Sequence, residues 1–81
     1  MKVTVRFHSY FRELAGCSEA DFKLRSGASL AELEEEVYRK FPRLEPMRRS
    51  MLIAVGVEYE FRDYVLKEGD EVSFFPPVQG G

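Results

Sequence analysis

The sequence predicts an α+β fold, in which one amphipathic helix packs across one face of a β-sheet. Apolar and polar residues alternate over residues 3–8 and 71–75, which is typical of strands with one buried face. Apolar residues recur at helical spacing over residues 29–41. The chain has 81 residues, so it has room for one domain with one modest core.

The N-terminal part of the sequence predicts two paired strands joined by a wide connection. The first strand covers residues 3–8, with its odd-numbered apolar side chains facing the core. A second alternation of apolar and polar residues covers residues 20–25. Between them, residues 10–14 are predicted to form a short helical turn that ends at Gly16.

The helix is the best-defined element of the sequence. Ser29 and Glu32 form the pattern of a capping box, in which each side chain accepts a hydrogen bond from the other residue's amide. Residues 34–36 are three glutamates, which we expect mainly on the other sides of the helix. Pro42 ends the helix, because the residue before a proline is disfavoured in the helical region. The apolar stripe expected to face the sheet consists of Leu30, Leu33, Val37 and Phe41.

The second half of the chain supplies the remaining strands. Residues 42–50 are expected to form a loop. Residues 51–55 are a continuous apolar run of strand length, which indicates a strand buried on both faces. Residues 58–64 are predicted to form a short edge strand.

The last strand, residues 71–75, leads directly into the C-terminal segment. Phe74 is predicted to face the core, so Phe75 faces the opposite side of the sheet. Pro76 and Pro77 cannot donate to a strand ladder, so the sheet is expected to end there. The sequence therefore predicts a folded domain over residues 1–75 and a flexible tail over residues 76–81.

Composition argues against several classes of function. The net charge is −2 with both signs interleaved, and no basic run indicates nucleic-acid binding. Arg43, Arg48 and Arg49 are interpreted as part of a solvated loop, with docking of an acidic partner as the alternative. One histidine and one cysteine provide no multi-residue His/Cys metal site, and no glycine-rich loop is present to hold a phosphate. We therefore expect no bound cofactor and no independent enzyme.

The sequence predicts a cytoplasmic protein. No run of 18 apolar residues is present, and the first six residues alternate instead of forming the apolar centre of a signal peptide. Cys17 is the single cysteine, so no disulfide forms within the chain, as is usual in a reducing compartment. We interpret Cys17 as structural or incidental.

The tail is the candidate functional segment. Two terminal glycines alone are a frayed end, but Gly80 and Gly81 follow a buried strand and two prolines that favour an extended exit. Six extended residues span about 20 Å at roughly 3.3–3.6 Å each, enough to enter a deep active site on another protein. The missing side chains of the glycines let the backbone pass through a narrow channel.

The chemistry expected of this tail takes place at the Gly81 carboxylate. A terminal carboxylate is ionised at pH 7 and is a poor electrophile. It has to be activated, for example as an acyl adenylate, before sulfur or an amine replaces the leaving group. The catalytic residues would then belong to partner proteins.

A docking surface is expected beside the base of this tail. Phe75 is the main candidate, because interface hot spots favour buried aromatic side chains. Arg6 is expected on or near this surface, and His8 taken alone is interpreted as a surface histidine. The predicted partner-binding residues are His8, Tyr59, Phe75, Pro76, Pro77 and Val78.

Three stretches resemble the MoaD family of sulfur carriers, which belongs to the ubiquitin-like MoaD/ThiS superfamily. They are residues 11–16 (FRELAG), residues 69–72 (GDEV) and, most specifically, residues 74–81 (FFPPVQGG). The similarity covers essentially the whole chain. One departure is Gly56, followed by Val57, where the family's turn is expected to hold an asparagine.

The resemblance implies a β-grasp fold with a mixed sheet of four to five strands and one main helix. It implies that an activating enzyme of the MoeB type uses ATP to adenylate Gly81, which is then converted to a thiocarboxylate. The tail would deliver its sulfur to a pterin precursor inside a large subunit of the MoaE type, during molybdenum cofactor biosynthesis.

Two other interpretations stay open. The first is a related carrier for thiamine, cysteine or tRNA thiolation, or a modifier joined to protein lysines. The second is an interaction domain whose tail is inert. The ending Phe-Phe-Pro-Pro favours the molybdopterin carrier over the thiamine-type carriers, which are usually shorter.

Overall fold

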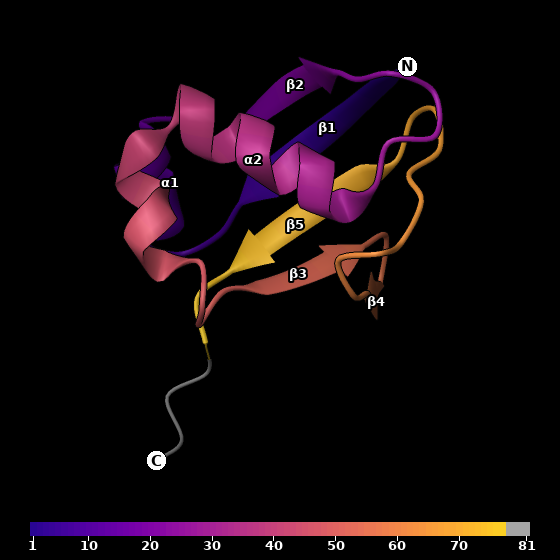
Figure 1. Ribbon diagram of the computed structural model, residues 1–81. Coiled ribbons are helices and arrows are strands. Elements are labelled where there is room, and N and C mark those ends of the chain that lie inside the picture. Colours follow the sequence, from indigo (N-terminus) through magenta and orange to yellow (C-terminus); the bar gives the residue numbers. More distant parts are fainter. Residues whose placement is uncertain (78–81) are drawn as a thin grey trace.

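A computed structural model describes residues 1–77, which form a five-stranded mixed sheet with one main helix across one face (Figure 1). The strands lie in the order β2-β1-β5-β3-β4, with β1 and β5 parallel and the other neighbours antiparallel. This arrangement confirms the predicted α+β class. The strands are β1 (Lys2–Phe7), β2 (Glu19–Lys23), β3 (Leu52–Val55), β4 (Glu58–Tyr59) and β5 (Glu71–Phe75).

The connection between β1 and β2 contains the predicted helical turn. Helix α1 covers Phe11–Ala15 and ends at Gly16, whose φ of 78° lies in the left-handed region that glycine adopts without strain. The ring of Phe11 is fully buried and fixes this turn to the core. The two strands pair antiparallel, with Val3 opposite Phe22, as the alternation predicted.

Helix α2 (Leu30–Lys40) confirms the predicted cap and stripe. The Glu32 amide donates to Ser29 Oγ at 3.2 Å, and the Ser29 amide donates to Glu32 Oε2 at 2.9 Å. Phe41 follows as the C-terminal cap, directly before Pro42. Leu30, Leu33 and Val37 are fully buried, together with Val3, Val5, Val72 and Phe74 on the facing strands. The helix therefore packs on the sheet as predicted.

The position of Glu34 is a correction to the prediction that the three glutamates lie mainly on other sides of α2. Only 3% of Glu34 is exposed. It accepts hydrogen bonds from the buried Tyr38 hydroxyl and from Arg62, whose Nε lies 2.6 Å from Glu34 Oε1. A buried carboxylate is tolerated when it has an ion-pair partner and hydrogen bonds. Arg62, which is 28 residues away in the chain, provides both the opposite charge and the hydrogen bond.

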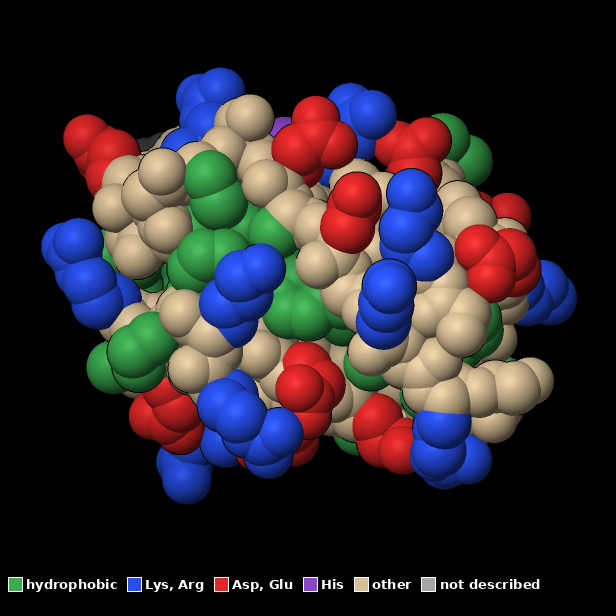
Figure 2. Space-filling view, turned by 90° about the horizontal axis from the view of Figure 1, so that it is seen from above, with side chains coloured by type: hydrophobic (Ala, Val, Ile, Leu, Met, Phe, Trp, Pro, Cys, Tyr) green, Lys and Arg blue, Asp and Glu red, His purple; other side chains and the backbone are tan. Residues whose placement is uncertain are grey.

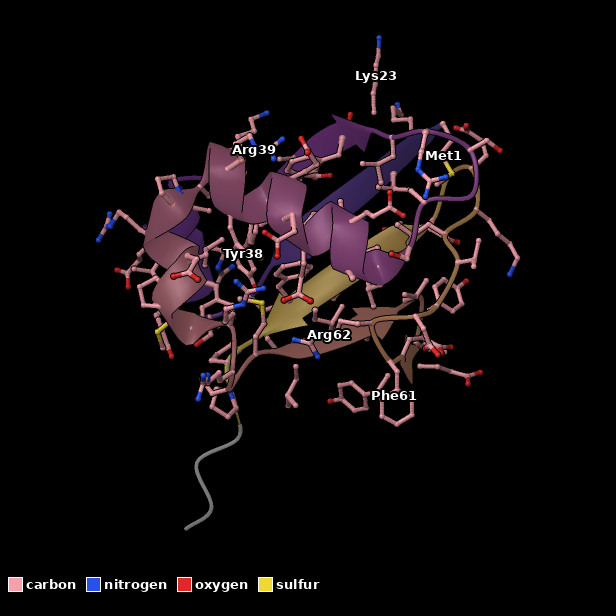
Figure 3. All side chains as sticks on the ribbon, in the orientation of Figure 1. Met1, Lys23, Tyr38, Arg39, Phe61 and Arg62 are labelled. Atoms are coloured by element: carbon pink, nitrogen blue, oxygen red, sulfur yellow. The ribbon has the colours of Figure 1, made fainter. Side chains whose placement is uncertain are left out.

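This buried group also raises the pKa of Tyr38 above its usual value. Burial of the phenol is the largest cause, followed by its hydrogen bond to the Glu34 carboxylate and the charge of that carboxylate. The Tyr38 hydroxyl also lies 3.6 Å from Sδ of Met51, the residue before β3. The cluster of Glu34, Tyr38 and Arg62 thus joins α2 to the residue just before β3 and to the segment just after β4 (Figure 3).

The segment after α2 also differs from the prediction. Residues 42–50 were expected to be a plain loop, but a 3₁₀-helix, η1, covers Pro42–Met47 and buries Leu44. Arg48 pairs with Glu35 at 2.8 Å and with Glu45 at 3.2 Å, with all three side chains about half exposed. These contacts agree with the interpretation of a solvated segment, because exposed pairs of this kind add little stability.

Two strands are shorter or more exposed than predicted. β3 was expected to be buried on both faces; Ile53 and Ala54, on opposite faces, are buried, but Leu52 and Val55 at its ends are partly exposed. In the described part of the chain no helix covers its second face, so burial under a helix does not account for the whole apolar run. The predicted edge strand over residues 58–64 is confirmed only at Glu58–Tyr59, and the chain then turns.

Charged side chains of both signs cover the face seen in Figure 2, with apolar side chains grouped between them. Lys40 lies over the rings of Phe22 and Phe41, at 5.5 and 5.7 Å from their centroids, and covers part of these rings. Over residues 1–77, no helix combines the length and the apolar composition needed to cross a membrane.

Candidate functional site

The face of the sheet opposite α2 carries the side chains nearest the end of β5. Phe74 is fully buried against the helix, so the next residue, Phe75, lies on the opposite face and is partly exposed. Leu52 lies directly across from Phe75 in the antiparallel pairing of β3 and β5. Side chains of directly opposed residues share a face, so Leu52 and Phe75 lie together there.

Three aromatic rings meet on this open face. His8 stacks on Phe75 with ring centroids 4.3 Å apart and planes 16° apart. Tyr59 approaches Phe75 edge-on at 6.4 Å and is 67% exposed. The structure therefore brings together three residues that the sequence singled out as partner contacts. We call His8, Leu52, Tyr59 and Phe75 the docking face; their role in binding stays a prediction.

Leu52 is the member of the docking face that sequence reasoning missed. It begins the apolar run of residues 51–55, which was interpreted as a strand buried on both faces. The docking face gives the run another cause, because Leu52 is apolar on the side that no helix covers. Only the pairing register of β3 with β5 places Leu52 beside Phe75.

Charged residues lie at the other end of the same face. Arg6 Nη2 is 2.8 Å from Glu71 Oε1, and both side chains are about half exposed. The pair joins β1 to β5, the two parallel strands at the centre of the sheet. Arg6 thus lies on the expected face, but its guanidinium is engaged within the chain.

His8 is held in its neutral form by its surroundings. The pKa of His8 lies below its ordinary value of 6.5, first because of burial and then because of the nearby charges of Arg12 and Arg6. Nε2 is buried and has no hydrogen-bond partner among residues 1–77. A neutral ring stacked on Phe75 suits an apolar contact surface.

We expect the His8 ring to titrate below pH 6.5, as followed by its ring proton shifts in NMR spectra. Because the folded-state pKa is lower than the unfolded one, neutral His8 stabilises the fold above pH 6.5. That contribution is lost as the pH falls through the folded pKa. Phe75→Ala should move the midpoint upward by exposing the ring, and an unchanged midpoint would contradict burial as the main cause.

The segment after the docking face begins with Pro76 and Pro77, which are partly buried and belong to no strand or helix. The sheet therefore ends at Phe75, as the two prolines predicted. Val78, Gln79, Gly80 and Gly81 lie outside the described residues, so the predictions for the tail are untested by the structure.

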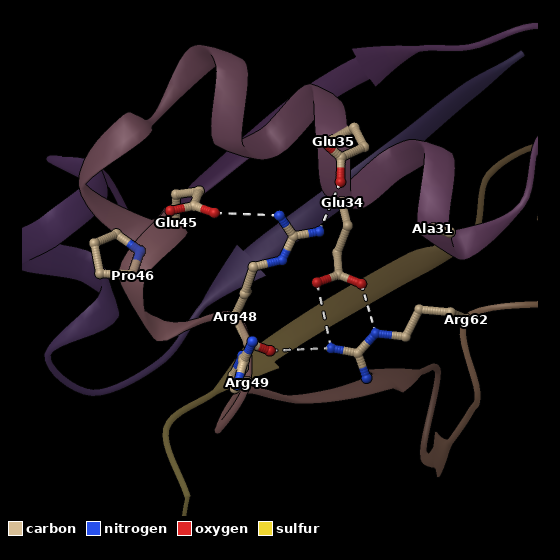
Figure 4. Close-up of a pocket in the computed structure, with 8 residues that line it drawn as sticks. All are labelled: Ala31, Glu34, Glu35, Glu45, Pro46, Arg48, Arg49 and Arg62. Carbon is tan, nitrogen blue, oxygen red and sulfur yellow. Dashed lines mark hydrogen bonds and ion pairs between the residues drawn. The ribbon is translucent and has the colours of Figure 1, made fainter.

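A hollow lies between α2, η1 and the segment around Arg62 (Figure 4). Its carboxylates and guanidiniums pair with one another: Glu34 with Arg62, and Arg48 with Glu35 and Glu45. Carboxylates engaged in this way are poorly suited to general acid–base work, which needs a group free to exchange a proton with a substrate. Among residues 1–77, no group of three or more His, Cys, Asp or Glu side chains is arranged to hold a metal ion. Cys17 is partly buried and packs against the core.

Comparison with known proteins identifies the family. Residues 5–81 match the family model described as the ThiS family. The chain belongs to the ThiS family. This match covers the tail as well as the β-grasp domain, and it agrees with the resemblance inferred from the ending FFPPVQGG.

Several known proteins are similar to this chain over nearly their full length. The molybdopterin synthase sulfur carrier subunit of Chlamydomonas reinhardtii is 32% identical over 83 residues, covering 100% of both chains. A Pyrococcus furiosus protein assigned as molybdopterin converting factor, subunit 1, has 34% identity and a TM-score of 0.89, covering 96% of this chain and 99% of that one. The complex of subunits 1 and 2 of molybdopterin-converting factor from Helicobacter pylori contains a chain with 27% identity, a TM-score of 0.73 and 100% coverage of both.

Proposed function

We propose that this ThiS-family chain is the sulfur carrier subunit of molybdopterin synthase. The observation that carries the proposal is the continuity of β5 with the tail. Phe75 ends the strand on the docking face, and the next six residues finish in Gly80 and Gly81. A carrier needs both parts: a surface that a partner recognises, and a reactive end that reaches the partner's active site. Full-length similarity to a molybdopterin synthase sulfur carrier subunit supports this choice.

The proposed chemistry takes place at the Gly81 carboxylate in two steps. In the first, a carboxylate oxygen attacks the α-phosphorus of ATP, and pyrophosphate leaves. In the second, hydrosulfide supplied by a donor attacks the acyl carbon, and AMP leaves with the former carboxylate oxygen. The result is a thiocarboxylate, in which sulfur replaces one oxygen. Donors on the partner would stabilise the oxyanion that develops.

Two partners follow from this chemistry. An adenylating enzyme of the MoeB type would bind ATP and activate Gly81. A large subunit of the MoaE type would receive the thiocarboxylate and pass its sulfur to a pterin precursor; the Helicobacter pylori complex of subunits 1 and 2 supports such a partner. The chain itself acts as a co-substrate, with catalysis on the partners, in the cytoplasm.

Intact mass spectrometry tests the proposal. We incubate the full chain with ATP, the activating enzyme and a sulfide donor, and expect a mass gain equal to the exchange of one oxygen for sulfur. Fragmentation should place the gain at Gly81. Adding the large subunit and the pterin precursor should return the original mass and yield molybdopterin. A thiocarboxylate consumed only by a thiamine, cysteine or tRNA pathway would instead favour a related carrier.

A further inference from the structure

Phe61 is exposed in a way that the fold does not explain. All seven phenylalanines of the chain lie within the described residues, and the other six are buried or partly buried. Phe61 is 84% exposed, and the nearby Val57, in the turn before β4, is 98% exposed. A scattered exposed apolar residue needs no explanation, but an exposed aromatic ring beside other apolar groups indicates a contact surface.

The backbone around Phe61 is fixed although its ring is in solvent. The Glu60 amide donates to the Ile53 carbonyl at 3.3 Å, and the Tyr64 amide donates to the Phe61 carbonyl at 3.0 Å. The Ala31 amide donates to the Arg62 carbonyl at 3.0 Å, and the Arg62 side chain is held by buried Glu34. A ring presented on an ordered backbone loses little backbone entropy on binding.

Phe61 continues the docking face beyond β4. The hydrogen bond of Glu60 extends the ladder of β3 and β4 by one residue, so Tyr59 and Phe61 project from the same side of the chain. Their Cα atoms are two residues apart, which is at most about 7 Å. Figure 3 places Phe61 on the lower side of the molecule, beneath β3 and β4. One partner surface can therefore cover Phe75, Tyr59 and Phe61.

The surroundings of Phe61 carry negative charge. Glu58, Glu60 and Asp63 lie within three residues of it in the chain, and none of the three forms an ion pair or side-chain hydrogen bond within residues 1–77. The neighbouring cation, Arg62, is engaged by Glu34. A complementary surface would offer an apolar recess for the ring, with lysine or arginine side chains at its border.

We propose that Phe61 is a binding anchor for the large subunit, inserting into an apolar recess bordered by cationic side chains. The inference rests on the proposed function. A carrier has to leave its activating enzyme to reach the synthase, so that encounter is short-lived. A subunit stays bound, and a stable interface buries about 800 Å² on each partner, more than a few side chains at the base of the tail supply. Phe61 and Val57 add exposed apolar area to that contact.

The test measures the dissociation constant for the purified large subunit of the same organism, by calorimetry with the full chain. Phe61→Ser should weaken binding about 30-fold, the level of a hot-spot residue, while Phe61→Leu should retain most of the affinity. The matched control is Val65→Ser, which removes another exposed apolar side chain and should change affinity less than about 3-fold. The fold-loss in affinity for the large subunit should exceed the fold-loss in the rate of adenylation by the activating enzyme.

The role of the negative charge near Phe61 is tested by replacing Glu58 and Glu60 with Gln and Asp63 with Asn. The triple variant should associate more slowly and lose most of the salt dependence of association, because the carboxylates no longer steer the cationic border. If the association rate of the triple variant depends on salt as strongly as that of the unmodified chain, the proposed cationic border of the recess is wrong.

Several outcomes would overturn the anchor. If Phe61→Ser binds the large subunit as the unmodified chain does, the anchor is wrong and the proposed function stands. If the unmodified chain itself does not bind the large subunit, both fail. Equal losses in adenylation and in binding would make Phe61 a general contact. If the unmodified chain self-associates, and Phe61→Ser abolishes this without changing the affinity for the large subunit, then a second copy of the chain and not the large subunit binds at Phe61.

Discussion

Deleting Gly81 is expected to abolish sulfur transfer while leaving the fold intact. The proposed reaction forms and breaks bonds only at the terminal carboxylate, and the deletion moves that group one residue closer to β5. A shift of about 3.3–3.6 Å takes the carboxylate out of reach of the groups that activate it. Stability should barely change, since the core consists of residues upstream, such as Val72 and Phe74. The measurement is thiocarboxylate formation by intact mass, with thermal unfolding recorded in parallel.

Two further variants distinguish the role of the Gly81 carboxylate from the roles of the other tail residues. Gln79→Ala keeps the length and both glycines, so it should form thiocarboxylate at nearly the normal rate. Gly80→Val also keeps the length, but its branched side chain should impair activation by narrowing the backbone's path. Thiocarboxylate yields that are equal for the Gly81 deletion and the full chain would refute the terminal-carboxylate mechanism.

The periodicity of the sequence was enough to predict the layers of the fold. Leu33 and Val37 lie one turn apart on α2, and Val3 and Val5 alternate with polar residues on β1, as burial on one side requires. Local signals such as the capping box at Ser29 were also confirmed, because both partners lie within three residues of each other. These features depend on neighbours in the chain, which a sequence displays directly.

Features that depend on distant pairing were missed. Glu34 was expected in solvent because a glutamate on a helix usually lies there, and its partner Arg62 is 28 residues away. Leu52 was assigned to a doubly buried strand because its apolar run does not show which face a helix covers. Phe61 was placed in an ambiguous strand, although the strand ends at Tyr59 and leaves the ring exposed.

The docking face could be predicted from the sequence only in part. Phe75 followed from alternation with Phe74, so the sequence predicted its direction. Its contacts with His8 and Tyr59 need the order β1-β5-β3-β4, which brings three strands from different parts of the chain together. The tail, in contrast, was predicted from its residue types and its place after the last strand, because its proposed chemistry needs a free carboxylate and no neighbouring side chain of this chain.

Leu33→Ala is expected to lower the free energy of unfolding by about 2–5 kcal/mol, the range for removing a buried leucine side chain. Leu33 is fully buried in the middle of the stripe that packs on β1 and β5. A small domain has a total stability of about 5–15 kcal/mol, so this loss is a large fraction of it. Each kcal/mol should lower Tm by about 4–8 °C in a domain of this size.

Leu33→Met is the matched control, since it nearly conserves volume and should cost less than about 1.5 kcal/mol. Calorimetric unfolding gives both values. Below its own Tm, Leu33→Ala should still accept sulfur at Gly81 at the normal rate, because the reaction uses the tail and the docking face and not the interior. It thus complements the Gly81 deletion, which should lose the reaction and keep the fold. A Leu33→Ala protein as stable as the unmodified chain would contradict the packing of α2 on the sheet. A folded Leu33→Ala protein that fails to form thiocarboxylate would show that the core and the tail do not act independently.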